Sequence, residues 1–349
     1  MNSLESQLEY PFGDALPETG KVMDILPGVR WLRMPLPFAL NHVNLWLLKD
    51  ELDGQEGWTI VDCGIDNATT RAAWENIFTD HLQDLPVLRV IATHYHPDHL
   101  GAAHWICSRW NVPLWMTGGE YAFSRVYSAA LPGADGEAMI AHFRRHGLSE
   151  EGVAQLEERK AYYPRLVPTI PATYARLQDQ QAVRIGAYEW QVITGFGHSP
   201  EHASLYCEAL DLLISGDMVL PRISTNVSVF SMEPEANPVQ AYLDSLQKMA
   251  GLPADTLILP SHGKPFRGLH TRIRQLQDHH AARLEEVFDA CQQAQSAADI
   301  LPVMFRRPLD AHQLSFALGE AIAHLHQLWL SGKLVREQSE AGILRFCQP

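Results

Sequence analysis

Short apolar runs, separated by polar and glycine-containing stretches, recur along the first three quarters of the chain. The run at residues 88–93 has the length of a buried strand. Apolar residues at helical spacing predict a helix over residues 67–82. This alternation of strands and helices favours an α/β sandwich. Similar apolar runs predict further strands at residues 29–34, 43–48, 58–62, 112–116, 188–193, 212–216 and 257–260.

The pattern changes at two places in the chain. Residues 118–176 are mostly helical in character and rich in tyrosine, arginine and histidine. After residue 268 the pattern predicts helices and then two short strands. We therefore expect a large domain over residues 1–268, with an inserted helical segment at 118–176, and a small domain over residues 269–349. The elements expected in the small domain are helices at 269–294, 299–305 and 310–330 and strands at 333–337 and 342–346.

Composition limits the classes of function. The 349 residues suffice for one large and one small domain. The formal net charge of −14, without any Lys/Arg-rich block, makes nucleic acid an unfavoured partner. No apolar run approaches the roughly 20 residues that cross a bilayer, and the first residues lack the pattern of a secretory signal. The five scattered cysteines indicate no disulfide framework, so we expect a cytoplasmic protein.

The hexapeptide His94-Tyr-His-Pro-Asp-His99 directly follows the predicted strand at residues 88–93. His94 and His96 point the same way if strand character persists. Pro97 suits the first position of a helix, which would carry Asp98 and His99 on its opening turn. One short segment can thus offer ligands to two metal ions. Imidazole and carboxylate donors suit zinc and, less selectively, iron or manganese.

Four more metal-capable side chains stand at the ends of predicted strands. Asp62, His198, Asp217 and His262 each follow an apolar run and lie beside or near a glycine. Glycine allows a sharp turn or the close approach of a ligand. Each residue taken alone could equally be a capping, turn-forming or core residue. Their recurrence at strand ends, however, indicates one shared site.

The motif His94-x-His-x-Asp-His99, with Asp62 upstream and His198, Asp217 and His262 downstream, resembles the metallo-β-lactamase superfamily. The resemblance covers about three quarters of the chain. It implies an αββα sandwich with the metals at one edge. The acidic residue at position 217 favours the branch that resembles glyoxalase II.

Site roles follow from this resemblance. It implies two metal ions, which we expect to be Zn²⁺, with iron or manganese as alternatives. Asp217 would bridge the two ions, and Asp62 would orient ligands from behind. The first ion would be held by His94, His96 and His198, and the second by Asp98, His99 and His262.

We expect a hydrolase in which a metal-bound hydroxide, oriented by Asp98 as the catalytic carboxylate, attacks the carbonyl of a small ester. A thioester of the acyl-glutathione or acyl-CoA type is the first choice, by resemblance. A lactone is second, and a phosphodiester, cleaved as by a ribonuclease, is third. A non-catalytic metal-binding effector is the remaining alternative.

The inserted segment at 118–176, here called the lid segment, lies between two predicted ligands and could fold over the metal edge. Tyr162 and Tyr163 would then contact an apolar tail of the substrate and Arg165 an anionic group. An ordinary solvated helical face is an equal alternative.

The small domain resembles the winged-helix tail of some superfamily members. We expect it to serve packing or formation of a homodimer, because its acidic and basic residues roughly balance. Its histidines at 279–280, 324 and 326 are expected on helix surfaces.

Overall fold

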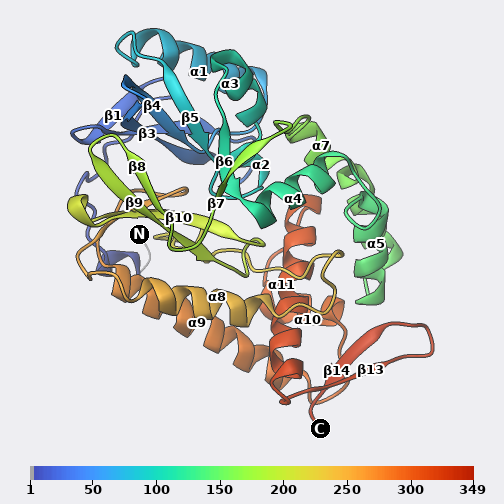
Figure 1. Ribbon diagram of the computed structural model, residues 1–349. Coiled ribbons are helices and arrows are strands. Elements are labelled where there is room, and N and C mark those ends of the chain that lie inside the picture. The colour runs from blue at the N-terminus through green and yellow to red at the C-terminus, as the bar shows by residue number, and fades with distance from the viewer. Residues whose placement is uncertain (1–3) are drawn as a thin grey trace.

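Two β-sheets lie face to face, and helices cover both outer faces (Figure 1). The structure is a computed structural model that describes residues 4–349, apart from the side chain of Glu158. The seven-stranded sheet runs in sequence order through β1 (Val22–Leu26), β2 (Val29–Pro35), β3 (His42–Leu52), β4 (Gln55–Val61), β5 (Val87–Ile91), β6 (Leu114–Thr117) and β7 (Tyr174–Leu177). The five-stranded sheet has the order β12-β11-β10-β9-β8, with β8 (Ala182–Ile185), β9 (Tyr188–Gly195), β10 (His202–Cys207), β11 (Leu212–Gly216) and β12 (Leu257–Pro260).

The outer layers are pairs of helices. α1 (Ala68–Asp80) and α3 (Ala103–Trp110) cover the seven-stranded sheet, while α8 (Pro238–Met249) and α9 (Leu269–Ala290) cover the five-stranded sheet (Figure 1). Apolar side chains of both sheets fill the space between them, including Trp31 and Trp46, whose rings stack at 6.2 Å. The predicted αββα sandwich is confirmed.

The direction of the strands determines at which edge of the sandwich functional side chains can lie together. β4, β5 and β6 are parallel neighbours, as are β11 and β12. The carboxyl ends of parallel strands meet at one edge of a sheet. The segments that follow β4, β5, β11 and β12 therefore carry the predicted ligands toward the same edge of the sandwich.

The lid segment folds as a series of short helices and then rejoins the sheet. Its final residues are strand rather than helix, since β7 begins at Tyr174 and pairs in parallel with β6. The helical insertion thus ends earlier than residue 176. Its elements are α4 (Gly118–Ser128), α5 (Gly136–Arg145), α6 (Glu150–Leu156), η2 (Glu157–Arg159) and α7 (Tyr162–Leu166).

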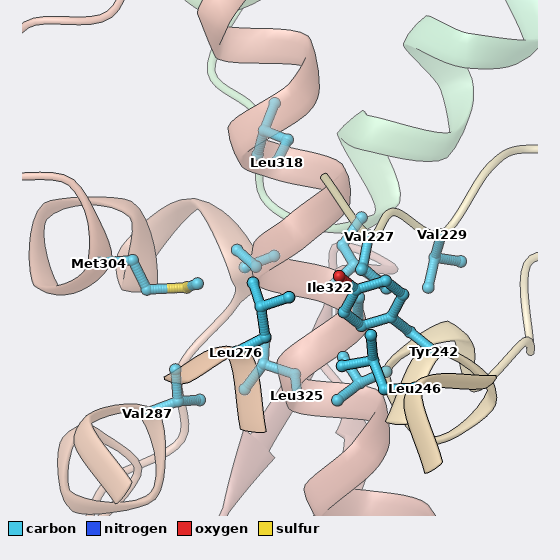
Figure 2. Close-up of a cluster of buried hydrophobic side chains, with 14 of the residues drawn as sticks. Val227, Val229, Tyr242, Leu246, Leu276, Val287, Met304, Leu318, Ile322 and Leu325 are labelled. Carbon is cyan, nitrogen blue, oxygen red and sulfur yellow. The ribbon is translucent and has the colours of Figure 1, made fainter. Parts of the chain in front are cut away.

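The C-terminal residues add helices and a hairpin at one end of the sandwich, beside the lid segment (Figure 1). Their apolar side chains join those of α8 in one cluster, in which Tyr242 and Leu246 face Ile322 and Leu325 (Figure 2). The tail thus shares its core with the sandwich. The remaining elements are η1 (Glu5–Gln7), α2 (Pro97–Leu100), η3 (Glu208–Leu210), α10 (Ala297–Met304), α11 (Ala311–Leu330), β13 (Val335–Gln338) and β14 (Leu344–Cys347).

The expectation of surface histidines in the tail is wrong for three of them. His280, His324 and His326 are fully buried. The reason is that α11 packs against α6, α8, α9 and α10 at once, so it has little free surface. His280 Nδ1 lies 3.2 Å from His324 Nε2, and burial lowers the pKa of both rings, to about 3 and about 4. These rings are therefore neutral core residues.

Among the described residues, no helix is long and apolar enough to span a membrane.

Candidate metal centre

Asp62 supports the site through hydrogen bonds to the residues around the hexapeptide. It directly follows β4 with a left-handed φ of 62°, a conformation that aspartate tolerates better than most residues. One carboxylate oxygen accepts a hydrogen bond from the Thr93 backbone N–H at 2.7 Å. The other accepts from Thr93 Oγ1 at 2.9 Å and from His99 Nδ1 at 2.8 Å. The carboxylate thus ties the end of β5 to the hexapeptide and orients His99.

Three imidazoles converge beside this supporting carboxylate. His94 Nε2 lies 2.9 Å from His96 Nδ1 and 3.2 Å from His198 Nε2. His94 and His96 follow β5, whereas His198 lies in the loop between β9 and β10. These nitrogens lie close enough together to ligate one cation.

Hydrogen bonds on the outer side of three rings fix which nitrogen faces inward. His198 Nδ1 donates to the Asn226 carbonyl and His262 Nδ1 to the His42 carbonyl, both at 2.8 Å. His99 Nδ1 donates to Asp62. A nitrogen that donates to a carbonyl or carboxylate carries a proton, so Nε2 is the ring nitrogen that faces the site and can offer its lone pair to a cation. This is the arrangement found in metal-ligating histidines.

Two carboxylates complete the arrangement. Asp98 Oδ2 lies 3.5 Å from His99 Nε2 and 3.4 Å from His262 Nε2. Asp217 turns Oδ2 toward His198 Nε2 at 3.5 Å and Oδ1 toward His262 and His99 at 3.4 and 3.6 Å. Asp217 therefore lies between the histidine cluster and the cluster of Asp98, His99 and His262.

The donor set fits divalent cations. His99 Nε2 and Asp217 Oδ1 are both buried, and neither has a hydrogen-bond partner among the described residues. Unpaired polar atoms in the interior are costly unless something else satisfies them. A cation between these atoms would do so, and the imidazole and carboxylate donors are those that zinc, iron and manganese accept.

The electrostatics of the ligands agree with this fit. Burial, reinforced by His198, lowers the pKa of His96 to about 3. Burial also disfavours the charged form of His262, but the Asp217 and Asp98 carboxylates outweigh it and raise its pKa to about 10. A proton on His262 thus takes the place of a cation beside these carboxylates. Metal binding is expected to release it.

The structure adds a residue that the sequence did not single out, Glu120 in the first turn of α4. Its carboxylate is fully buried. It accepts from the Tyr95 N–H at 2.8 Å, from Ser199 Oγ at 2.6 Å and from the Glu201 N–H at 2.7 Å. These partners lie beside the ligands of the histidine cluster, so Glu120 holds the two ligand-bearing loops together.

Glu120→Gln should weaken metal binding. A carboxamide has one oxygen, so its NH2 end faces either the Tyr95 N–H or the donors from Ser199 and Glu201. Losses at residues that support metal ligands are typically 10- to 100-fold in affinity. We expect about that loss in zinc affinity, measured by competition with a chromogenic chelator. Glu137→Gln, which removes an exposed lid carboxylate paired with Lys160, is the control. Unchanged affinity in a folded Glu120→Gln protein would contradict this role.

His202 is a second supporting residue that the sequence alone did not single out. It opens β10, is fully buried, and accepts a hydrogen bond from the Asp217 N–H at 3.1 Å. Gly216 has a φ of +54°, and a Cβ there would lie 2.2 Å from His202 Nε2. Only glycine therefore lets the chain pass His202 and present Asp217. The glycine before Asp217 was the one available signal.

A cavity of about 160 Å³ adjoins His96 and Pro97. Tyr162 and Tyr163 line it, and Tyr163 donates to the Tyr95 carbonyl at 2.6 Å. Arg165 lies elsewhere: it is exposed and is not among the lining residues. The arginine on the cavity wall is Arg159.

Comparisons with known proteins agree with this architecture. The chain is 58% identical to a beta-lactamase domain protein from Burkholderia ambifaria, with a TM-score of 0.94 and full coverage of both chains. It is 28% identical to a metallo-beta-lactamase family protein from Thermus thermophilus, with a TM-score of 0.78, over 93% of this chain and 100% of that one. A curated relative, "Probable metallo-hydrolase YqjP" of Bacillus subtilis (strain 168), is 21% identical over 85% of this chain and 91% of its own length.

Family models cover both parts of the molecule. The model for the metallo-beta-lactamase-like C-terminal domain matches residues 284–349, which include α10, α11 and the final hairpin. The model for the metallo-beta-lactamase superfamily matches residues 40–262, a span that contains all seven predicted ligands and more than half of the chain. The chain therefore belongs to the metallo-beta-lactamase superfamily of metallo-hydrolases, a fold that implies divalent metal binding, and its His and Asp clusters could hold such ions.

Proposed function

We propose that this protein is a binuclear metallohydrolase that cleaves small thioesters of the acyl-glutathione or acyl-CoA type. The observation that carries the proposal is the position of Asp217, whose two oxygens face the two ligand clusters separately. A carboxylate in this position suits a pair of cations, which we take to be Zn²⁺. The relative named a metallo-hydrolase supports the reaction class.

The residues have separable roles in this proposal. His94, His96 and His198 would hold one cation, Asp98, His99 and His262 the other, and Asp217 both. Two such cations, when bound, acidify a water molecule and polarise a carbonyl. Asp98 is the catalytic carboxylate: burial opposes its charge, but His99 and His262 hold its pKa below the usual range. An ionised Asp98 oxygen can orient the attacking water and accept its proton.

A thioester suits this set of groups for a chemical reason. A thiol has a pKa of about 8.5, so the leaving group of a thioester can depart as a thiolate, without protonation by a strong acid. The cavity next to His96 offers a mostly apolar space for an acyl chain. The net charge of −14 argues against a phosphodiester in a nucleic acid. The four buried, unpaired cysteines are compatible with a reducing cytoplasm.

The test is a panel of substrates assayed with zinc-loaded protein: an octanoyl thioester of glutathione, octanoyl-CoA, a γ-lactone and an aryl phosphodiester. We expect kcat/KM for a thioester to exceed that for the others by at least about tenfold. A preference for the lactone or the phosphodiester, or turnover of none of them by metal-replete protein, would contradict the proposal.

A further inference from the structure

The cavity beside the metal centre lies between three parts of the chain. Met139 and Phe143 of the lid form one wall, Val229 and Phe230 a second, and Phe316 of α11 belongs to a third. The cavity reaches His96 of the metal centre. An apolar chain can therefore lie between the lid and the tail with its reactive end at the metals.

Arg159 brings a positive charge to this wall. Its guanidinium carbon lies 4.1 Å from the centre of the Tyr162 ring and 5.7 Å from that of Phe316. It donates a hydrogen bond to His312 Nδ1. Burial lowers the pKa of His312 to about 4, so this partner is neutral. Among the described side chains, no carboxylate lies within ion-pair distance of Arg159.

Two other lid cations, Lys160 and Arg144, differ from Arg159. Lys160, the next residue, pairs with Glu137 at 2.7 Å and with Glu157 at 2.6 Å. Arg144 pairs with Glu150 on the exposed face of α5. A guanidinium has five N–H donors, and contact with aromatic faces leaves most of them available. Arg159 thus keeps both its charge and free donor capacity at the cavity wall.

The position of Arg159 relative to the reacting centre follows from its neighbours. Tyr162 lies on α7 and lines the cavity together with His96. The guanidinium carbon of Arg159 lies 4.1 Å from the centre of the Tyr162 ring. Arg159, Tyr162 and the predicted metal ligand His96 therefore border the same cavity. A substrate that spans this cavity can meet both Arg159 and His96.

We infer that Arg159 binds an anionic group of the substrate while the cavity holds an apolar acyl chain. The inference rests on the proposed function and narrows it to thioesters that combine an apolar acyl group with a carboxylate. Such an anion could belong to the thiol part or to the far end of the acyl chain. Arg159, rather than the exposed Arg165, would be the residue of the lid that selects for charge.

The test measures binding of thioethers, which cannot be hydrolysed, to zinc-loaded protein by calorimetry. S-octylglutathione carries carboxylates on the thiol part, S-octyl-N-acetylcysteamine is neutral, and its 7-carboxyheptyl analogue carries a carboxylate at the chain end. Loss of a charge-assisted hydrogen bond corresponds to roughly 10- to 100-fold in affinity. We expect Arg159→Gln to lose that factor for at least one anionic ligand and less than about twofold for the neutral one.

The two anionic ligands carry their carboxylates at opposite ends. The ligand whose affinity falls in Arg159→Gln therefore shows which end of the substrate contacts this residue. Arg144→Gln removes the same charge from the exposed lid face and should change no affinity. Arg159→Lys should recover part of the loss. An equal loss for the neutral ligand would instead make Arg159 a structural link between lid and tail, and no loss at all would also overturn the inference. Because binding needs no turnover, these outcomes are independent of the substrate panel.

Discussion

Asp98→Ala should lose about three orders of magnitude in kcat while the protein stays folded. Asp98 lies 3.4 Å from His262 Nε2 and 3.5 Å from His99 Nε2, where its carboxylate can both ligate and accept a proton. Proton transfer by a positioned carboxylate typically contributes 10²- to 10⁴-fold. The side chain is partly exposed at the start of α2, and Asp217 stays beside the same two imidazoles when Asp98 is removed. Steady-state kinetics of the metal-loaded variant, with circular dichroism as the folding check, measure the effect.

The control for this variant is Asp66→Ala. Asp66 accepts two hydrogen bonds from Arg71, at 2.6 and 2.8 Å, and its loss removes one negative charge that belongs to no predicted ligand. We expect kcat within about twofold of the parent, because Asp66 is not among the seven predicted ligands. Full activity in Asp98→Ala, or an equal loss in both variants, would contradict the role assigned to Asp98.

Asp50→Ala should destabilise the fold by about 3–5 kcal/mol, the usual cost of removing one partner from a buried ion pair. Asp50 Oδ2 accepts from Arg89 Nη2 at 2.8 Å and from Thr59 Oγ1 at 2.5 Å. Oδ1 accepts from the Gly186 N–H at 2.7 Å, in the turn between β8 and β9. Asp50 thus links the two sheets, and its loss leaves Arg89, with a 3% exposed side chain, charged and without its carboxylate.

Urea unfolding monitored by tryptophan fluorescence measures this loss. Glu56→Gln is the matched control, because its carboxylate pairs with Lys49 on the exposed side of the same sheet at 3.1 Å. An exposed pair of this kind contributes at most about 1 kcal/mol. A loss below about 1 kcal/mol in Asp50→Ala would mean that the buried network does not hold the sheets together.

Much of the site could be predicted because its residues stand at strand ends. The hexapeptide follows β5, and Asp62, Asp217 and His262 lie at or near the ends of β4, β11 and β12. A buried parallel strand is visible in a sequence as a short apolar run. The polar side chain that ends such a run is therefore visible as well.

The supporting residues could not be predicted in the same way. Glu120 and His202 contact the ligand loops through partners that are distant in sequence, and no local pattern reports such contacts. The sequence did not show that Arg159 lines the cavity and Arg165 does not, because a short helical segment does not reveal which face meets a cavity. β7 was overlooked because a four-residue strand at the end of a helical segment gives little periodicity.

The tail illustrates the same limit on a larger scale. Its helices were expected to form a small domain that serves packing or dimerisation, with histidines on the surface. The packing of α11 against α6, α8, α9 and α10 buries three of those histidines, and the apolar residues of these elements belong to one cluster, part of which Figure 2 shows. Helical periodicity shows which positions are apolar, but not how many neighbours a helix has. A helix with neighbours on several sides also buries its polar positions.

The most direct test of the metal centre is anomalous diffraction from crystals of zinc-loaded protein. We predict two zinc peaks per chain, one among His94, His96 and His198 and the other among Asp98, His99 and His262, with Asp217 in contact with both. A single peak, or peaks away from these residues in fully loaded protein, would contradict the binuclear centre on which the proposed hydrolysis depends.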